Sequence, residues 1–383
     1  MPTWPRQILF GDVDAMYASA AVVADPGLAG KPIAVGGRPP RGIITAASYP
    51  ARRFGVGSAM PTAHALRLCP DLVLVPPDWP LYRRLHSRMR EVTDSLFPAT
   101  AWSSIDEFYA DTTELQSLYP NPRVLGQTVK DALLEATGLR STVAVATGKT
   151  IAKVATDQHK PDGLAVIEPG TEAAFLGPLP VEALPGIGPK TAVTLHRWNV
   201  RLIGDLLKPH VEPLLRSLWG TRRFVFTALA RGIDSEPLVT DRQPKSMGHE
   251  TTFEHDTNEV AFLEETLRTF LGDLAHDLRC NNLEAWAFTV KLKDARFKVV
   301  TRHRQFAKPL NYDPRMWAAI SSALRSLLVP GTRYRLAGLS LSGLVPSNTG
   351  LFDHQTTKAV AALDLLIEKH GSGVIGLGRT PAK

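Results

Sequence analysis

The sequence predicts an α+β protein with several domains. In its first half, short apolar runs typical of buried strands alternate with amphipathic helical segments, and a glycine-rich turn near residue 186 interrupts a helical stretch. After a proline-containing linker, strands with alternating apolar and basic side chains follow. A chain of 383 residues, 44% of them hydrophobic, is long enough for about two to four domains with cores of their own.

The first predicted strand ends in an acidic pair, Asp12 and Asp14. Side chains two apart on a strand point to the same face, so both carboxylates can reach one site. The segment 101–111 is also predicted as a strand and carries Asp106 and Glu107 in its interior. A charge placed there needs a partner, and Mg²⁺, which prefers oxygen ligands, is the expected one. Carboxylates from two strands can hold two such ions about 3.5–4 Å apart, the arrangement that serves in-line phosphoryl displacement.

Asp14 has a second interpretation, because it could cap the helix predicted over residues 15–23. Two short apolar strands follow, and then a basic and aromatic stretch. In that stretch Tyr49 and Arg52 share a face if the backbone is helical, and an arginine so placed can bind phosphate bidentately. An exposed basic helix is the alternative.

Helical periodicity predicts helices over residues 81–96 and 123–136, and residues 142–146 are predicted as a further strand. This order predicts a sheet with two helices on one face. Residues 147–150, Thr-Gly-Lys-Thr, lack the first glycine of a phosphate loop, so a Walker site is rejected. The helix that follows ends where Lys160 is presented at a turn.

The segment 184–192 is the clearest local motif, a helix–hairpin–helix signature. Gly186 and Gly188 let the backbone approach a phosphate, and the next helix, with Lys190 near its start, offers free N–H groups and a positive dipole end. Such contacts bind the DNA backbone rather than its sequence. The alternative is an ordinary turn between two helices.

A linker over residues 236–245 precedes a last domain that is locally basic: between Lys291 and Lys308, seven basic residues stand against one acid. The pattern predicts a sheet whose apolar face is backed by a helix over 262–278 and whose cationic face lies on a nucleic-acid backbone. A solvated edge of a plain α+β domain is the alternative. The residues expected to face the core are Trp286, Phe288, Val290 and Leu292. The residues expected to contact DNA are Lys291, Lys293, Lys298, Arg302, Arg304, Arg333 and Arg335.

The overall charge is positive, since Lys plus Arg exceed Asp plus Glu by 44 − 37 = 7, and the sequence pI is about 9.4. An anionic partner such as nucleic acid is therefore favoured. Cys69 and Cys280 lack the spacing of a zinc site or a disulfide framework, which fits a reducing cytosol. No secretion signal is visible, and no stretch approaches the roughly 18–20 apolar residues that a membrane span needs. We therefore expect a soluble cytoplasmic protein without a membrane partner.

Taken together, these motifs resemble the Y family of translesion DNA polymerases, most closely its DinB or polymerase IV branch. The resemblance extends from Asp12 to about Pro346, with the motifs in the family order. Many relatives have Thr where this chain has Ala46, so one hydroxyl contact to a triphosphate is missing or supplied by Thr45. The matching motifs are Asp12-x-Asp14, the segment Tyr49 to Arg53, Ser104-Ile105-Asp106-Glu107, Lys160-Pro161-Asp162-Gly163 and Pro185-Gly186-Ile187-Gly188.

The resemblance implies a right-hand polymerase with a palm, small fingers, a helical thumb that contains the helix–hairpin–helix, and a C-terminal α+β little finger. The implied boundaries are 1–15 and 80–168 for the palm, 16–79 for the fingers, 169–234 for the thumb, 235–244 for the linker, 245–346 for the little finger and 347–383 for a tail.

The resemblance also implies roles for single residues. The carboxylates of Asp12, Asp106 and Glu107 would be the catalytic metal ligands, and Val13 would add its backbone carbonyl. The incoming nucleotide would be bound by Tyr49, Arg52 and Lys160 at its triphosphate, and by Tyr17 as the steric gate that excludes a ribose 2′-OH.

The implied activity is template-directed, distributive addition of dNTPs to a primer 3′-OH by a monomer that uses two Mg²⁺ ions, or Mn²⁺. No third carboxylate cluster indicates an exonuclease, so proofreading is not expected. Leu351 and Phe352 would bind a sliding clamp, although the usual leading Gln is absent. Two alternatives stay open: a non-catalytic DNA- and clamp-binding factor on the same fold, and another metal-dependent enzyme such as a nuclease or a nucleotidyl cyclase.

Overall fold

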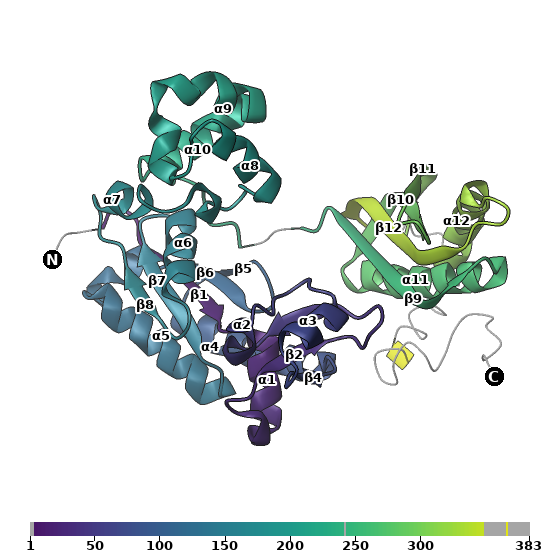
Figure 1. Ribbon diagram of the computed structural model, residues 1–383, viewed down its shortest axis with the longest axis horizontal. Helices are drawn as coiled ribbons and strands as arrows, with labels where there is room; N and C mark the ends of the chain where they lie inside the picture. The colour runs from purple at the N-terminus through teal and green to yellow at the C-terminus, as the bar shows by residue number, and fades with distance from the viewer. Residues whose placement is uncertain (1–3, 241–242, 348–364, 367–383) are drawn as a thin grey trace. The chain divides into compact units, whose positions relative to one another are not determined.

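The computed structural model describes residues 4–240, 243–347 and 365–366. The chain divides into two units, residues 1–242 and 243–383, and each is described by itself (Figure 1). The proposed clamp-binding residues Leu351 and Phe352 lie outside the described residues. No helix in the described part of the chain is both long and apolar enough to cross a membrane.

A five-stranded sheet with the strand order β5-β6-β1-β7-β8 forms the centre of the first unit. The central strand β1 is antiparallel to both neighbours, and Asp12 lies directly opposite Glu107 on one side and Thr142 on the other. All six residues of β1 are buried, because helices cover both faces of the sheet. The strands are β1 (Ile8–Val13), β5 (Thr100–Trp102), β6 (Glu107–Asp111), β7 (Ser141–Ala146) and β8 (Leu164–Val166).

Two long helices cover one face of this sheet, as the sequence predicted. α4 (Trp79–Leu96) and α5 (Pro122–Thr137) share a core with Leu9, Phe108 and Val143 of the strands. The α5 helix ends at Gly138, whose φ of 71° is the left-handed conformation that glycine adopts without strain. The opposite face is covered by α6 (Lys149–His159), which packs on Phe10 and Ala144 (Figure 1).

The prediction of one continuous strand over 101–111 is wrong. Residues 103–106 form a turn between β5 and β6, so Asp106 lies in the turn and Glu107 is the first residue of β6. The Ser104 hydroxyl accepts hydrogen bonds from the backbone N–H groups of Asp106 (3.3 Å) and Glu107 (3.1 Å). A serine that satisfies two N–H groups in this way reverses the chain and competes with a strand.

A smaller layer and a helical segment complete the first unit. The three-stranded sheet β3-β2-β4 has its own core, with α1, α2 and α3 beside it. Its elements are α1 (Met16–Ala24), η1 (Pro26–Leu28), β2 (Ile33–Gly36), β3 (Ile44–Ala47), α2 (Tyr49–Arg52), α3 (Thr62–Leu68) and β4 (Val73–Val75). The remaining elements are the turn η2 (Thr113–Ser117), and in the helical segment α7 (Glu172–Leu176), η3 (Val181–Ala183), α8 (Pro189–Arg197), η4 (Ile203–Leu207), η5 (Pro209–Val211), α9 (Glu212–Trp219), η6 (Gly220–Arg222) and α10 (Arg223–Ala230).

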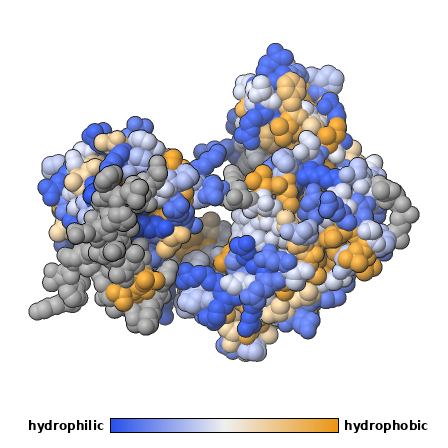
Figure 2. Space-filling view, turned by 180° about the vertical axis from the view of Figure 1, so that it is seen from behind, coloured by the Kyte–Doolittle hydropathy of each residue, from blue (hydrophilic) through white to orange (hydrophobic). Residues whose placement is uncertain are grey.

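The predicted hairpin motif has an α-helix on one side only. Its second helix, α8, begins at Pro189 directly after Gly188, but a single 3₁₀ turn, η3, precedes it. Pro180 and Pro185 bracket that turn, and a helix rarely continues into the residue before a proline. Large apolar side chains on α8 and α10 are exposed, namely Val193 (α8), Phe224 and Val225 (α10). Figure 2 shows apolar patches on the surface of the helical segment.

The second unit is a four-stranded antiparallel sheet, in the order β11-β10-β12-β9, with two helices on one face. Its helices contribute Leu267, Leu271 and Ile320 to a core shared with Phe288 and Val290 of β10. The elements are β9 (Ser246–Thr257), α11 (Val260–Cys280), β10 (Leu283–Asp294), β11 (Val299–Leu310), α12 (Asp313–Leu327) and β12 (Tyr334–Pro346).

The predicted faces of this sheet need two corrections. Trp286 is 41% exposed rather than buried, because the pairing of β10 is irregular between Ala285 and Ala287 and the alternation shifts there. Arg302 lies opposite Val290, and Arg304 lies opposite Phe288. Directly opposed residues share a face, so these arginines lie on the helix-covered side of the edge strand.

Lys291 and Lys293 alternate with the core residues of β10 and therefore lie on the open face, as predicted. Lys298 and Arg333 precede β11 and β12 and belong to neither strand face. Arg335 lies at an irregularity of β12, with its guanidinium 4.2 Å from the ring centroid of Phe297. The basic residues of this unit are thus spread over the open face, one edge and a turn, and their contact with DNA stays a prediction.

Candidate active site

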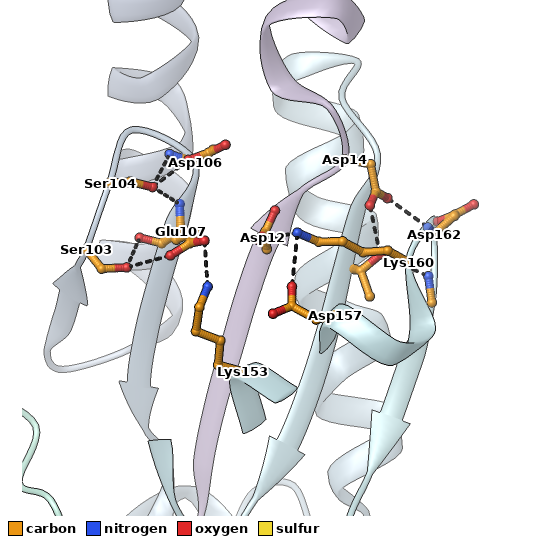
Figure 3. A network of polar contacts seen from close by, with 12 residues as sticks. Asp12, Asp14, Ser103, Ser104, Asp106, Glu107, Lys153, Asp157, Lys160 and Asp162 are labelled. Atoms are coloured by element: carbon orange, nitrogen blue, oxygen red, sulfur yellow. Dashed lines mark hydrogen bonds and ion pairs between the residues drawn. The ribbon is translucent and has the colours of Figure 1, made fainter. Parts of the chain in front are cut away.

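Three acidic residues gather at one end of the central sheet (Figure 3). Asp12 on β1 lies directly opposite Glu107 on β6. The backbone N–H of Val13 donates to the carbonyl of Asp106 at 3.1 Å, which fixes the turn beside the end of β1. Strand pairing therefore brings together carboxylates that are more than ninety residues apart in the sequence.

Asp12 is almost fully buried and is paired with a lysine. Its Oδ2 lies 2.5 Å from Nζ of Lys160, the residue that caps the C-terminus of α6. Burial raises the pKa of Asp12 to about 7, although Lys160 opposes that shift. Burial alone would lower the pKa of Lys160, but the charge and hydrogen bond of Asp12, together with the charges of Asp157 and Glu107, raise it above its ordinary value.

Glu107 is also paired with a lysine of α6. Its Oε1 lies 2.7 Å from Nζ of Lys153, and its Oε2 accepts a hydrogen bond from the Ser103 hydroxyl at 3.1 Å. Burial would raise the pKa of Glu107, but the hydrogen bond and charge of Lys153 lower it below the ordinary value. Asp106 is bound by an uncharged side chain instead: its Oδ1 accepts a hydrogen bond from the Ser104 hydroxyl at 2.5 Å.

The donor set fits a hard divalent cation, because all three side chains offer carboxylate oxygens. As they stand, Asp12 and Glu107 are turned toward lysines, and within the described residues no three His, Cys, Asp or Glu side chains are arranged to hold a metal. The three carboxylates are adjacent, but their conformations are set by Lys160, Lys153 and Ser104. Their role as metal ligands therefore stays a prediction.

Asp14 does not cap helix α1. The N-cap of α1 is Ala15, and no side chain accepts a hydrogen bond there. Instead, Asp14 is buried and accepts from the Thr142 hydroxyl at 2.9 Å and from the backbone N–H of Asp162 at 2.7 Å. Asp14 therefore anchors the turn that presents Lys160.

The two side chains predicted to bind triphosphate from α2 lie together. The Arg52 guanidinium lies 4.6 Å from the ring centroid of Tyr49, so the helical alignment predicted for this stretch is confirmed. The Tyr49 hydroxyl donates to Asp14 at 3.2 Å, and burial, followed by the Asp14 charge, strongly raises the pKa of Tyr49. Nε of Arg52 donates to the carbonyl of Ala47 at 2.9 Å, while the residue itself is exposed.

Tyr17 lies on α1 and packs in an aromatic group. Its ring centroid is 4.4 Å from that of Tyr82 and 5.9 Å from that of Trp79. Burial raises the pKa of Tyr17, and the charge of Asp106 adds to the shift. The ring is therefore held by two neighbours within electrostatic reach of the acidic cluster.

Sequence reasoning missed Lys153, Ser103 and Thr142, which contact the acidic residues directly. Lys153 carried a usable signal: it lies seven residues before Lys160, about two helical turns, so both point to the same side of α6. Ser103 and Thr142 carried none, because their contacts depend on a turn and on strand register.

Residues 147–150, Thr-Gly-Lys-Thr, which lack the phosphate-loop motif, lie at the N-terminus of α6. A carboxylate from the end of the helical segment binds there. The N–H of Thr150 donates to Oδ2 of Asp234 at 2.5 Å, and Lys149 pairs with Glu236 at 2.9 Å. A Cβ at Gly148 would lie 2.4 Å from Cβ of Asp234, so this contact requires glycine. Arg6 donates to the carbonyls of Asp234 and Glu236. We call Arg6, Gly148, Lys149, Thr150, Asp234 and Glu236 together the linker clasp.

Comparison with known proteins agrees with this geometry. The impB/mucB/samB family model matches residues 11–157, and the model of its C-terminal domain matches residues 244–354. A protein named DNA polymerase IV from Gluconobacter oxydans is 36% identical over 340 residues, which cover 88% of this chain and 95% of that protein. One from Methanoculleus marisnigri is 37% identical over 348 residues, covering 90% and 96%. A solved Y-family DNA polymerase chimera of Dbh and Dpo4 matches with a TM-score of 0.81 and 26% identity over 89% of this chain and all of that one.

The chain belongs to the Y family of DNA polymerases. Membership in its polymerase IV branch makes it a translesion, DNA-directed DNA polymerase that depends on divalent metal. A solved insertion ternary complex of Dbh DNA polymerase also covers 89% of this chain, with 26% identity and a TM-score of 0.65. Such polymerase complexes support binding of DNA and dNTP by members of the family. The non-catalytic factor and the unrelated metal enzymes are not favoured.

Proposed function

We propose that Asp12, Asp106 and Glu107, with the Val13 carbonyl, bind two Mg²⁺ ions, for which Mn²⁺ can substitute. The supporting observation is the register that sets Asp12 opposite Glu107, with Asp106 in the adjoining turn. When bound, such ions lower the pKa of a primer 3′-OH and neutralise the leaving pyrophosphate. The carboxylates of this chain fix the place where that charge is stabilised.

Three side chains would bind the nucleotide triphosphate. Lys160 lies beside Asp12, so its ammonium group would need only a side-chain movement to reach a phosphate at the metal site. Arg52 is exposed and held over the Tyr49 ring, which orients its guanidinium for bidentate contact. The Tyr49 hydroxyl would add a hydrogen bond after leaving Asp14.

Tyr17 would exclude ribonucleotides by contact with the 2′-OH. Its packing against Tyr82 and Trp79 limits the movement of the ring, which is what a steric gate requires.

DNA would be bound at the hairpin and at the second unit. Gly186 has a φ of 95°, and apart from Gly188 itself and its chain neighbours no atom of the described residues lies within 4 Å of a Cβ placed at Gly188. The backbone there is therefore open to a phosphate. Lys190 lies in the first turn of α8. In the second unit the proposed contacts are Lys291 and Lys293 on the open face, with Lys298, Arg302, Arg304, Arg333 and Arg335 at its edge and turns. We further propose distributive synthesis without proofreading by a cytoplasmic monomer, and a sliding clamp as the partner of Leu351 and Phe352.

Primer extension tests the proposal. On a primed template with Mg²⁺ and each dNTP, the intact chain should add the templated nucleotide, and Asp106→Ala should lose this activity while keeping DNA affinity. Asp131→Ala is the matched control, since Asp131 is an exposed acid on α5 paired only with Gln127 among the contacts described. Extension by Asp106→Ala at the control rate would rule out the assigned metal site, and DNA binding without extension by the intact chain would favour the non-catalytic factor.

A further inference from the structure

Lys153 of α6 and Lys160, which caps the C-terminus of α6, pair with two of the carboxylates that the proposed function assigns to metal. Lys153 pairs with Glu107 at 2.7 Å, and Lys160 pairs with Asp12 at 2.5 Å. We propose that Lys153 and Lys160 are resident counter-cations of the acidic cluster, and that divalent metal must displace them from Glu107 and Asp12. This inference rests on the proposed metal site and adds a link between metal loading and nucleotide binding.

Both ion pairs are partly shielded from solvent. The side chains of Lys153 and Lys160 are 24% and 23% exposed, and those of Glu107 and Asp12 are 25% and 5% exposed. Charges in such surroundings interact more strongly than exposed pairs do, because less water screens them. A carboxylate oxygen held by an ammonium group is not free to bind a metal, so each pair competes with metal directly.

Each lysine has a second contact that can hold it after displacement. Nζ of Lys153 lies 4.9 Å from the ring centroid of Phe10, a favourable place for a cation on an aromatic face. Nζ of Lys160 lies 3.5 Å from Oδ1 of Asp157. The lysines can therefore leave the carboxylates without losing every favourable contact.

The charge balance gives the exchange a direction. Three carboxylates and two ammonium groups leave one net negative charge, and two divalent ions would turn this into three net positive charges. A nucleotide triphosphate brings about four negative charges and restores the balance. Full metal loading is therefore favoured when nucleotide is present, and Lys160, released from Asp12, becomes free for the triphosphate.

Mn²⁺ binding to the nucleotide-free full chain, measured by the electron paramagnetic resonance signal of free Mn²⁺, tests the exchange. Lys153→Met should bind Mn²⁺ about tenfold more tightly than the unaltered chain, because Glu107 has lost its competing cation. Lys153→Arg, which keeps the charge, should bind as the unaltered chain does. Lys149→Met is the matched control, since Lys149 lies one turn earlier on α6 and pairs with Glu236 outside the cluster.

If Lys153 only positions Glu107, Lys153→Met should bind Mn²⁺ more weakly, and this result or an unchanged affinity would overturn the exchange. After subtraction of the Mn²⁺ that dATP binds in the absence of protein, the affinity of the unaltered chain for Mn²⁺ should rise about tenfold when dATP is added, and Lys153→Met should reduce that gain. Asp106→Asn separates the two proposals: it should weaken Mn²⁺ binding, and unchanged binding would overturn the metal site itself. Thermal unfolding of each variant shows that the comparison is made on folded protein.

Discussion

Asp12 and Asp14 are two residues apart, and the structure uses both to hold one turn. Asp12 binds the side chain of Lys160, and Asp14 binds the backbone N–H of Asp162. The sequence predicted that both carboxylates can reach one site, but it could not predict which partner each of them has. One partner of Asp14 is Thr142, which donates to it from the neighbouring strand, and this contact depends on strand register.

The ring of Tyr17 should determine how strongly ribonucleotides are excluded. Tyr17→Ala should incorporate ribonucleotides at least tenfold more efficiently relative to deoxynucleotides, because the ring that meets the 2′-OH is gone. Tyr17→Phe should keep the discrimination of the unaltered chain, since the ring rather than the hydroxyl makes the contact. The ratio of kcat/KM for dCTP and CTP measures both, and equal ratios in the alanine variant and the unaltered chain would remove Tyr17 from this role.

At the level of elements, α6 connects the acidic cluster to the linker clasp. Its N-terminus has no cap of its own, and Asp234 supplies one from 84 residues away. Its body carries Lys153, and Lys160 follows its last turn. An anion at a helix N-terminus is stabilised by free N–H groups and by the helix dipole, so the clasp and the site share one rigid element.

Removing this cap should destabilise the first unit modestly. Asp234→Ala should lower the free energy of unfolding by about 1 kcal/mol, the usual effect of losing an N-cap carboxylate. Urea unfolding of the full chain measures this change. Asp131→Ala, on exposed α5 surface, should change the same quantity by less than about 0.5 kcal/mol. Equal effects of the two substitutions would mean that the Asp234 contact contributes no stability.

Asp205 should make the helical segment sensitive to acid. Burial would raise its pKa, but Lys208 at 2.7 Å and the N–H groups of Leu202 and Arg201 lower it to about 2. Because the folded pKa lies below the unfolded value of about 3.9, the stabilisation is complete above that value and is lost as pH falls toward 2. Asp205→Asn should therefore cost about 2 kcal/mol at pH 6 and about half of that at pH 3, measured by urea unfolding. A pH-independent cost would contradict the shifted pKa.

These elements also show what the sequence could predict. The long helices α4, α5 and α11 were predicted close to their observed bounds, because a helix that covers a sheet repeats its apolar residues every three to four positions. The turn at Ser103–Asp106 and the irregularity beside Trp286 were missed, since each depends on side-chain hydrogen bonds or cross-strand pairing that leave no periodic trace.

For the whole molecule, the excess of seven basic residues can favour DNA binding only where basic side chains lie on a surface that DNA can reach. In the second unit, Lys291 and Lys293 lie on the open face, whereas Arg325 of α12 lies on the helix side and pairs with Glu264 at 2.9 Å. Lys291 is itself paired with Glu250 at 2.6 Å. A phosphate that binds Lys291 must therefore replace a carboxylate of the same sheet.

DNA affinity measured against salt concentration tests this placement. Each lysine that neutralises a phosphate contributes about 0.9 to the slope of log K against log salt, because it releases bound counterions. Lys291→Met should lower the slope by about that amount, and Arg325→Met should leave it unchanged. Glu250→Gln should tighten binding at low salt, since Lys291 no longer has an internal partner. Equal slopes for the two charge-removing variants would mean that DNA does not lie on the open face of this sheet.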